Sequence, residues 1–393
     1  MVMKTERENC ATILFSRLRK GQAFKIAFVF IALLLTNISP MSAALKGDKF
    51  VIDGVSYQVI DETNMYVCAL GIDYSNTKSE VDIPQTVTNK DEKFTVTQFG
   101  GSWEENYQVK VIKLPSTVTT INSMAISGNN SLTDFYIPSS VTTINKDFGS
   151  VATHFPKFHV EGSNFYADAN GVLYSADKTV LYAVPSSATV TDGKYTFPDG
   201  VKSILSEVIA GMSGLTTIGI PASLEYIASG AFTNSNNNIA AVNVDVGNTH
   251  FSVADNGALI KLNASGNGAD TLVYYPKNHA GETFTVPDNV TVLLPNCIAY
   301  NSNVTTVNLN KTITTATGAL TSLHNLTTLG ISASVTKLDG FTSDCPKISA
   351  YNIDEGNTVY ESKDGIVFTK DGKTLVLYPP ARPDTVYTVP EGT

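Results

Sequence analysis

Cysteine is scarce in this chain of 393 residues. Only four are present, and Cys10 precedes the apolar N-terminal segment described below. The other three, Cys68, Cys297 and Cys345, cannot build a disulfide framework for a chain of this length, and they lack the Cys-x-x-Cys spacing of common zinc sites. Stability must therefore come from a hydrophobic core, and apolar residues make up 42% of the chain. We expect neither a metal nor any other cofactor.

Catalytic motifs are also missing. The chain contains no Gly-x-Ser-x-Gly elbow, no phosphate-binding loop and no His-Glu-x-x-His motif. Its five histidines are scattered, so a catalytic cluster would have to assemble between distant segments. We therefore predict a protein that is not an enzyme.

Positive charge is in short supply. The formal net charge is −9, from 27 basic and 36 acidic residues. Residues 1–44 hold six of the basic and two of the acidic residues, so the remainder carries 21 basic and 34 acidic residues, a net charge of −13. Such a surface repels phosphate groups, which argues against nucleic acid and anionic lipid as partners.

The first 44 residues are typical of a secretory signal peptide. Basic residues precede an apolar run from Ile26 to Leu35, and Ser42, Ala43 and Ala44 are the small residues that a signal peptidase recognises. The apolar run is about half of the ~20 residues needed to cross a bilayer, so we expect cleavage after Ala44 and no membrane insertion afterwards. The mature protein is then secreted or held at the bacterial cell surface.

An internal repeat is the strongest signal in the chain. The pattern apolar-x-x-apolar-x-apolar recurs along the chain. Its first three copies end at Leu114, Ile137 and Val160, which are 23 residues apart. Later copies end at Ile220, Val244, Leu309, Ile331 and Ile353, with partial copies ending at Phe197, Val286 and Val389. Proline often follows, which ends a strand because it has no N–H to donate. A single unit is too small to fold alone, so units must stack. We predict a mainly β, right-handed solenoid of ~23-residue units with short parallel strands.

Three longer gaps interrupt the repeat. They lie near 162–185, 247–276 and 356–379, and each contains β-rich runs around a short polar turn, which predicts a β-hairpin insertion. Residues 45–108 differ from the rest and are expected to form an N-terminal cap with a first irregular repeat. The solenoid then covers 109–393. Because the last residues begin a new unit and stop, we expect that the natural chain continues.

These units resemble the BspA-type leucine-rich repeats (type 5) of bacterial surface proteins. The resemblance rests on segments such as 220–232 and 341–348, and on the Asn-Gly-Val-Leu-Tyr sequence at 170–174. It covers roughly Val81 to Thr393. It implies a leucine-rich-repeat-like fold, export from the cell, and a role in adhesion to host matrix proteins, in contacts with other cells or in surface assembly.

A binding surface is expected on the strands. The residue before the last apolar position of each copy should lie on an exposed, concave face, because side chains alternate along a strand. These residues are Lys113, Tyr136, His159, Gly219, Asn243, Asn308, Gly330 and Asn352. The first three are a cation, an aromatic ring and an imidazole, which are typical interface anchors, so we predict that they form the binding site. The alternative is that all eight are ordinary solvated strand residues, with the hairpins then available for binding.

Three functions are compatible with this pattern. The favoured one is adhesion or protein–protein interaction, with a matrix protein or another cell-surface protein as partner. A second is surface glycan binding, which favours aromatic platforms, but Trp103 is the only tryptophan. A third is a carbohydrate-active enzyme on a β-helix. That would need clustered carboxylates or basic groups on neighbouring units, and the small neutral residues between 219 and 352 argue against it.

Overall fold

The computed structural model describes residues 44–101, 105–233, 238–263 and 270–393. The predicted signal peptide up to Ala43, and Trp103, lie outside these residues. All the regular secondary structure within them is β-strand, which confirms the predicted fold class. No helix in these ranges is long and apolar enough to cross a membrane.

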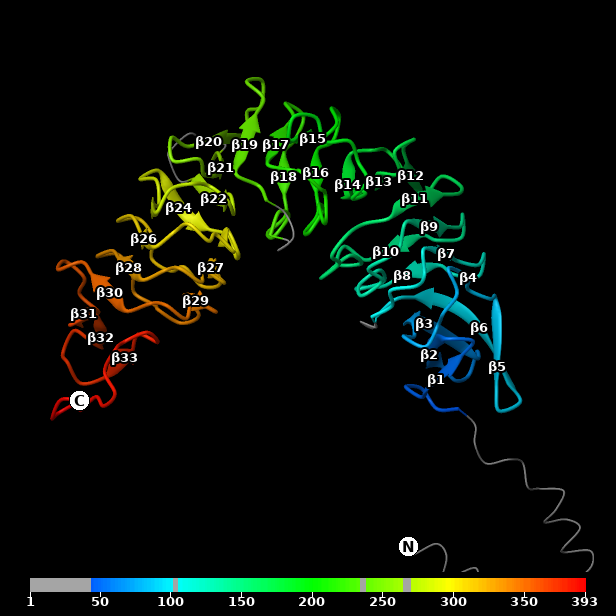
Figure 1. The fold of residues 1–393 in the computed structure, drawn as a ribbon, viewed down its shortest axis with the longest axis horizontal. Helices are drawn as coiled ribbons and strands as arrows, with labels where there is room; N and C mark the ends of the chain where they lie inside the picture. The colour runs from blue at the N-terminus through cyan, green and yellow to red at the C-terminus, as the bar shows by residue number, and fades with distance from the viewer. Residues whose placement is uncertain (1–43, 102–104, 234–237, 264–269) are drawn as a thin grey trace, which may run out of the picture.

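The strands stack into an open arc with the N-terminal strands at one end and the C-terminus at the other (Figure 1). A ladder of three- and four-residue strands follows the outer edge of the arc, and it is divided into three sheets. The first outer sheet contains β4 (Glu80–Asp82), β7 (Val111–Lys113), β9 (Asp134–Ile137) and β11 (Lys157–Val160). The second contains β15 (Lys194–Thr196), β17 (Thr217–Ile220) and β19 (Ala241–Val244). The third contains β23 (Thr283–Thr285), β26 (Thr306–Asn308), β28 (Thr328–Ile331) and β30 (Ala350–Ile353).

A second ladder, in which all strands but β24 have two residues, follows the inner edge of the arc (Figure 1). It contains β8 (Thr120–Ile121), β10 (Thr143–Ile144), β16 (Ser203–Ile204), β18 (Tyr226–Ile227), β24 (Val290–Leu293), β25 (Ile298–Ala299), β27 (Leu320–Thr321) and β29 (Thr342–Ser343). Pairing in both ladders is parallel, and equivalent residues of neighbouring units face each other. Phe135, for example, pairs with Ile112 and with Phe158. Each 23-residue step of the sequence repeat is therefore one turn of the solenoid, called a rung below.

The three insertions are antiparallel meanders. The expected hairpins each have an additional strand. The meanders contain β12 (Phe165–Ala167), β13 (Leu173–Ser175) and β14 (Val180–Ala183); β20 (Phe251–Val253), β21 (Leu259–Lys261) and β22 (Asp270–Tyr274); and β31 (Tyr360–Lys363), β32 (Ile366–Thr369) and β33 (Leu375–Leu377). The last strand of the first meander pairs in parallel with β16, and that of the second with β24. The first two meanders therefore join the inner ladder while interrupting the outer one.

Each of the first two meanders also separates two hydrophobic cores. The first core contains residues between Val55 and Ala210, the second between Val172 and Tyr274, and the third between Ala258 and Val367. Leu173 belongs to the first core, whereas its neighbour Tyr174 belongs to the second. Strands buried on both faces have continuous apolar sequences, as residues 172–174 and 258–260 do around the central strands of these two meanders.

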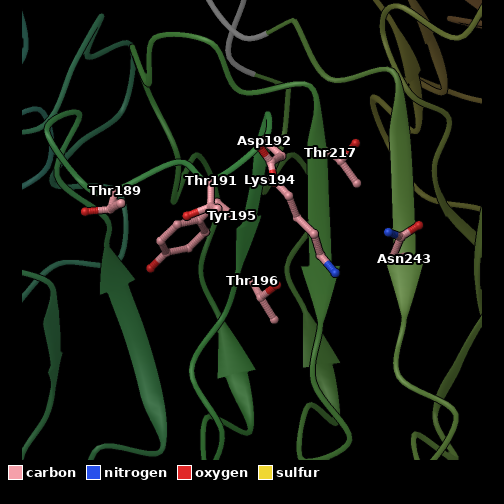
Figure 2. A pocket seen from close by; sticks show the side chains of 8 residues that line it. All are labelled: Thr189, Thr191, Asp192, Lys194, Tyr195, Thr196, Thr217 and Asn243. Atoms are coloured by element: carbon pink, nitrogen blue, oxygen red, sulfur yellow. The ribbon is translucent and has the colours of Figure 1, made fainter.

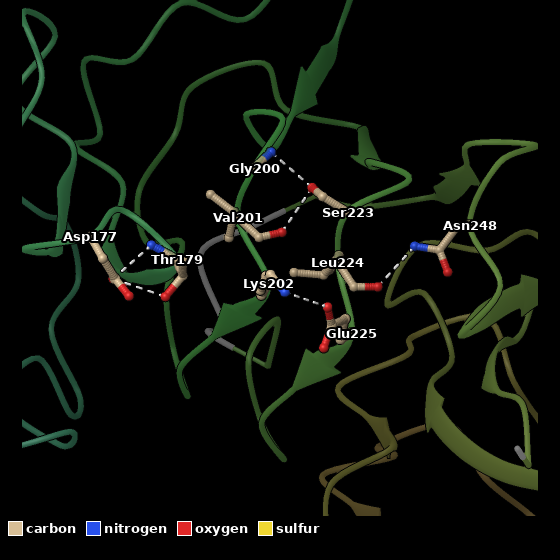
Figure 3. Close-up of polar contacts among 9 residues, drawn as sticks. All are labelled: Asp177, Thr179, Gly200, Val201, Lys202, Ser223, Leu224, Glu225 and Asn248. Atoms are coloured by element: carbon tan, nitrogen blue, oxygen red, sulfur yellow. Dashed lines mark hydrogen bonds and ion pairs between the residues drawn. The ribbon is translucent and has the colours of Figure 1, made fainter.

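Buried asparagines tie one rung to the next. The side-chain amide of Asn248 donates to the carbonyl oxygens of Pro221 (2.7 Å) and Leu224 (3.0 Å) in the preceding rung. Its side-chain oxygen accepts from the backbone N–H groups of His250 and Phe251, both at 2.8 Å. Figure 3 shows the contact with Leu224 beside further links between rungs, among them the hydroxyl of Ser223. Asn106, Asn301, Asn310 and Asn357 make equivalent sets of bonds.

The N-terminal strands extend the inner ladder. They are β1 (Lys49–Ile52), β2 (Val55–Asp61), β3 (Tyr66–Ile72), β5 (Thr86–Asn89) and β6 (Glu92–Phe99). β1 and β2 pair antiparallel around Asp53 and Gly54, and the sheet continues through β3 and β6 to β8 and β10. The first core of the solenoid is thereby covered at this end by a mixed sheet, in which β1, β2 and β3 are antiparallel and β3 pairs with β6 in parallel.

Candidate functional site on the first outer sheet

The structure brings Lys113, Tyr136 and His159 together on three adjacent strands. Tyr136 pairs with Lys113 on one side and with His159 on the other. The rings of Tyr136 and His159 stack with their centroids 4.3 Å apart and their planes 11° apart. The ammonium of Lys113 lies 5.7 Å from the centre of the tyrosine ring, within the range of a cation–π contact. The three predicted residues therefore form one continuous surface.

Three carboxylates complete this surface, and the sequence analysis did not identify them. Lys113 forms an ion pair with Glu80 and lies 3.7 Å from Asp82. Asp134 accepts a hydrogen bond of 2.7 Å from Nε2 of His159. Each acid occupies a strand position on the exposed face, so the alternation that predicted Lys113 and its neighbours also contained the signal for these partners.

Hydrogen bonding shifts the pKa of one member of each ion pair, Asp134 and Lys113. Burial alone would raise the pKa of Asp134, but hydrogen bonds from His159 and Thr133 outweigh it, and the pKa is lowered. The hydrogen bond to Glu80 raises the pKa of Lys113. The side chains of Lys113 and His159 remain 42% and 40% exposed, so both are accessible to a partner. Lys113 and Asp134 are thus both charged at neutral pH, and each is paired with a neighbour on a regular strand.

The curvature of the arc differs from the expectation. The predicted residues were assigned to a concave face, but β7, β9 and β11 follow the outer edge of the arc in Figure 1. Both sides of each rung are built from strands, whose neighbours lie about 4.8 Å apart on either side. Strand spacing alone therefore does not determine which ladder lies inside, and we correct the predicted location to the convex side.

The second outer sheet carries a different, mostly polar surface (Figure 2). A groove of about 570 Å³ extends along it, lined by Thr189, Thr191, Asp192, Lys194, Tyr195, Thr196, Thr217 and Asn243. The side chain of Lys194 extends toward β17, where Thr217 is its partner in the sheet (Figure 2). Gly219 pairs with Thr196 and Asn243, so the predicted position on the middle strand contributes no side chain.

The third outer sheet has small or neutral residues at the predicted positions. Asn308, Gly330 and Asn352 lie side by side on β26, β28 and β30. The amide of Asn308 donates to the hydroxyl of Thr285 at 3.4 Å. Ionisable anchors comparable to Lys113 and His159 do not occur at these positions.

The described residues offer little for metal or thiol chemistry. No group of three histidine, cysteine or carboxylate side chains among them is arranged to hold a metal ion. Cys68, Cys297 and Cys345 are free and buried. Burial raises the pKa of the Cys68 thiol to about 12 and also raises the pKa of the other two thiols. A thiol in this state is a packing residue, because the reactive thiolate is disfavoured.

The stacked parallel rungs and asparagine links define a repeat protein of the leucine-rich-repeat class. The chain belongs to the BspA type leucine rich repeat family, whose model matches six copies at residues 76–153, 191–265 and 273–363. No curated protein matches the chain.

Several solved structures are similar to this chain. A leucine rich cell surface protein from Faecalibacterium prausnitzii A2-165 is 17% identical, with 79% of this chain and 84% of that chain covered and a TM-score of 0.40. The pneumococcal vaccine antigen PcpA is 15% identical over 81% and 84%, with a TM-score of 0.37. A leucine-rich repeat protein from Eubacterium ventriosum ATCC 27560 is 18% identical over 86% and 92%, with a TM-score of 0.34. These likenesses are low, and membership of the family rests on the family model.

Proposed function

We propose that this is a non-enzymatic, secreted or cell-surface repeat protein that binds a protein partner through the first outer sheet. The observation that carries the proposal is the continuous surface of Lys113, Tyr136 and His159 with their three carboxylates. Aromatic and charged groups that are already held in place lose little conformational freedom on binding, which favours a protein interface. We further propose that the partner is a matrix protein or another cell-surface protein, so that the activity is adhesion.

An array of matrix proteins and glycans tests this proposal. The purified protein is applied beside a triple variant with Lys113→Ala, Tyr136→Ala and His159→Ala. A matched control carries Asn308→Ala and Asn352→Ala on the third outer sheet. We expect saturable binding to a protein, weakened at least about tenfold in the triple variant, as loss of one interface hot spot predicts, and unchanged in the control. Equal binding by all three proteins, or no protein bound at all, would overturn the assignment.

Glycan binding is the second candidate, and the stacked rings of Tyr136 and His159 favour it. A sugar can pack on this pair, and the separate groove around Lys194 offers further hydroxyl and amide groups to a glycan. Binding to glycans alone on the same array would support this function. A carbohydrate-active enzyme is less well supported, because Glu80 and Asp134 are each paired with a basic side chain.

A further inference from the structure

The three meanders do not cover the outer ladder equally. In the first meander, the N–H of Phe158 in β11 donates to the carbonyl of Gly171 at 3.0 Å. In the third, the N–H of Tyr351 in β30 donates to Gly365, also at 3.0 Å, and the hydroxyl of Ser362 donates to the carbonyl of Tyr351 at 2.6 Å. The last outer strand before each of these meanders therefore has its central residue covered by the meander.

The second meander makes no hydrogen bond to the corresponding residue, Val242 in β19. Its turn residue Gly257 lies against His279, since a Cβ on this glycine would lie 2.6 Å from the imidazole. The neighbouring Asn256 donates instead to Thr285 in β23, at 2.8 Å. Val253 occupies the position of Ser362 and has no hydroxyl to donate. Among the described residues, neither the N–H nor the carbonyl of Val242 has a hydrogen-bond partner.

The geometry of β19 shows which backbone groups are free. The N–H groups of Ala241 and Asp245 donate to Thr216 (3.2 Å) and Ile220 (2.9 Å), so these residues face β17. Alternate residues of a strand direct their backbone groups to opposite sides, and Val242 and Val244 therefore face away from β17. Val242 is only 5% exposed. Backbone groups left unpaired at such a position are rare and costly, which favours an added partner.

A groove runs along this free edge. It measures about 660 Å³ and lies between β19 and the first strand of the meander, β20. Two of its lining residues, Val246 and Val253, are exposed apolar side chains, and Val246 is fully exposed. An edge strand with unpaired backbone N–H and C=O groups can bind an extended polypeptide, and adjacent apolar side chains add contacts to it.

We propose that the free edge of β19 binds an extended peptide segment of a partner protein, which adds to the second outer sheet as a further strand. The segment carries apolar side chains toward Val246 and Val253. Its remaining side chains are neutral or basic, because the protein has a formal net charge of −9. This site is separate from the first outer sheet, so neither assignment depends on the other.

A labelled peptide tests the proposal directly. The probe is a fluorescein-labelled peptide of alternating valine and threonine with a lysine at each end, and binding to the protein is followed by fluorescence anisotropy. The control probe has the same sequence with alternate backbone amides N-methylated, which removes donors without removing side chains. We expect saturable binding of the first probe and at least about tenfold weaker binding of the second, as the loss of one or two hydrogen bonds predicts. Equal affinity for both probes, or no binding of the first at millimolar protein, would overturn the proposal.

Variants of Val253 locate the site. Val253→Ser introduces a hydroxyl at the position of Ser362 in the third meander. This hydroxyl should donate to the carbonyl of Val242 and so compete with the peptide for that acceptor. Val253→Ala is the matched control, since it shortens the side chain without adding a donor and is the residue found in the first meander as Ala167. We expect Val253→Ser to weaken the peptide more than Val253→Ala. An equal effect of both would contradict strand addition at Val242. The triple variant of the first outer sheet should bind the peptide normally, which distinguishes the two sites.

Discussion

A buried asparagine can connect two neighbouring rungs. Its side-chain NH2 group donates to carbonyl oxygens of the preceding rung, and its side-chain oxygen accepts from backbone N–H groups two and three residues further along the chain. Asn248 makes four such bonds and is 9% exposed. We expect Asn248→Ala to lower the free energy of unfolding by about 2–4 kcal/mol, because buried backbone groups lose their partners on both sides. Urea denaturation followed by circular dichroism measures this. Asn325→Ala is the control, since Asn325 is half-buried, donates one bond to Ser302 and accepts one from Lys347 at the surface, and its loss should be below about 1 kcal/mol. Similar losses for both variants would argue against the role of Asn248.

Glu207 gives the protein a dependence on pH. Its carboxylate accepts a hydrogen bond of 2.7 Å from the N–H of Val151. Burial raises the pKa of Glu207, the hydrogen bond from Val151 lowers it in part, and nearby Asp147 raises it, so that the folded value lies above the ordinary 4.5. Folding therefore favours the protonated form. The contribution of this group to stability is greatest below about pH 4 and falls as the pH rises through the folded pKa.

Glu207→Gln removes the loss of stability that accompanies ionisation of Glu207, because the amide is neutral and its oxygen can still accept the hydrogen bond from Val151. We expect a higher Tm than the wild type at pH 7 and an equal Tm below about pH 4. Glu225→Gln is the control of opposite sign, since the hydrogen bond from Lys202 lowers the pKa of Glu225. That variant should have a lower Tm at pH 7. Thermal melts across this pH range measure both, and a Glu207→Gln protein that is less stable at pH 7 would contradict the explanation.

The first and third meanders are each fixed to the outer ladder by a glycine turn. Gly171 has a φ of +82°, and a Cβ there would lie 2.7 Å from the Cβ of Lys157 in β11. We expect Gly171→Ala to cost about 2–4 kcal/mol, from the positive φ together with the steric overlap. Gly372, in the third meander, has a φ of +71° but no atom within 3.6 Å of an added Cβ, so Gly372→Ala should cost only about 1 kcal/mol. Equal costs in chemical denaturation would show that docking against β11 contributes nothing.

The sequence predicts those structural elements that repeat from one rung to the next. The outer strands and their register follow from apolar residues such as Ile112, Phe135 and Phe158, because each copy repeats the same pattern. The hairpin predicted around each polar turn corresponds to the second and third strands of a meander. The first strand, such as β12, was missed because it is only three or four residues long and precedes the turn that indicates the hairpin. The free edge of β19 was not predictable either, because the second meander has a similar turn sequence, and the place where Gly257 packs is not visible in the sequence.

At the scale of the molecule, the meanders divide the solenoid into parts with separate cores. Sequence periodicity could not show this, because the boundary passes between neighbouring residues of one strand. Leu259 and Ile260 are both buried in β21, yet Leu259 belongs to the second core and Ile260 to the third. Contacts in a solenoid are made mainly between neighbouring rungs, so a local loss of packing should destabilise one part more than the others.

Leu259→Ala and Ile260→Ala therefore have different expected consequences. Each removes a fully buried aliphatic side chain and should cost about 2–5 kcal/mol locally. In hydrogen exchange measured by mass spectrometry, Leu259→Ala should speed exchange in β17 and β19, and Ile260→Ala in β26 and β28. The first outer sheet should exchange at the wild-type rate in both, which serves as the internal control. If the two variants speed exchange in the same segments, the solenoid unfolds as one cooperative unit and the meanders do not separate its cores energetically.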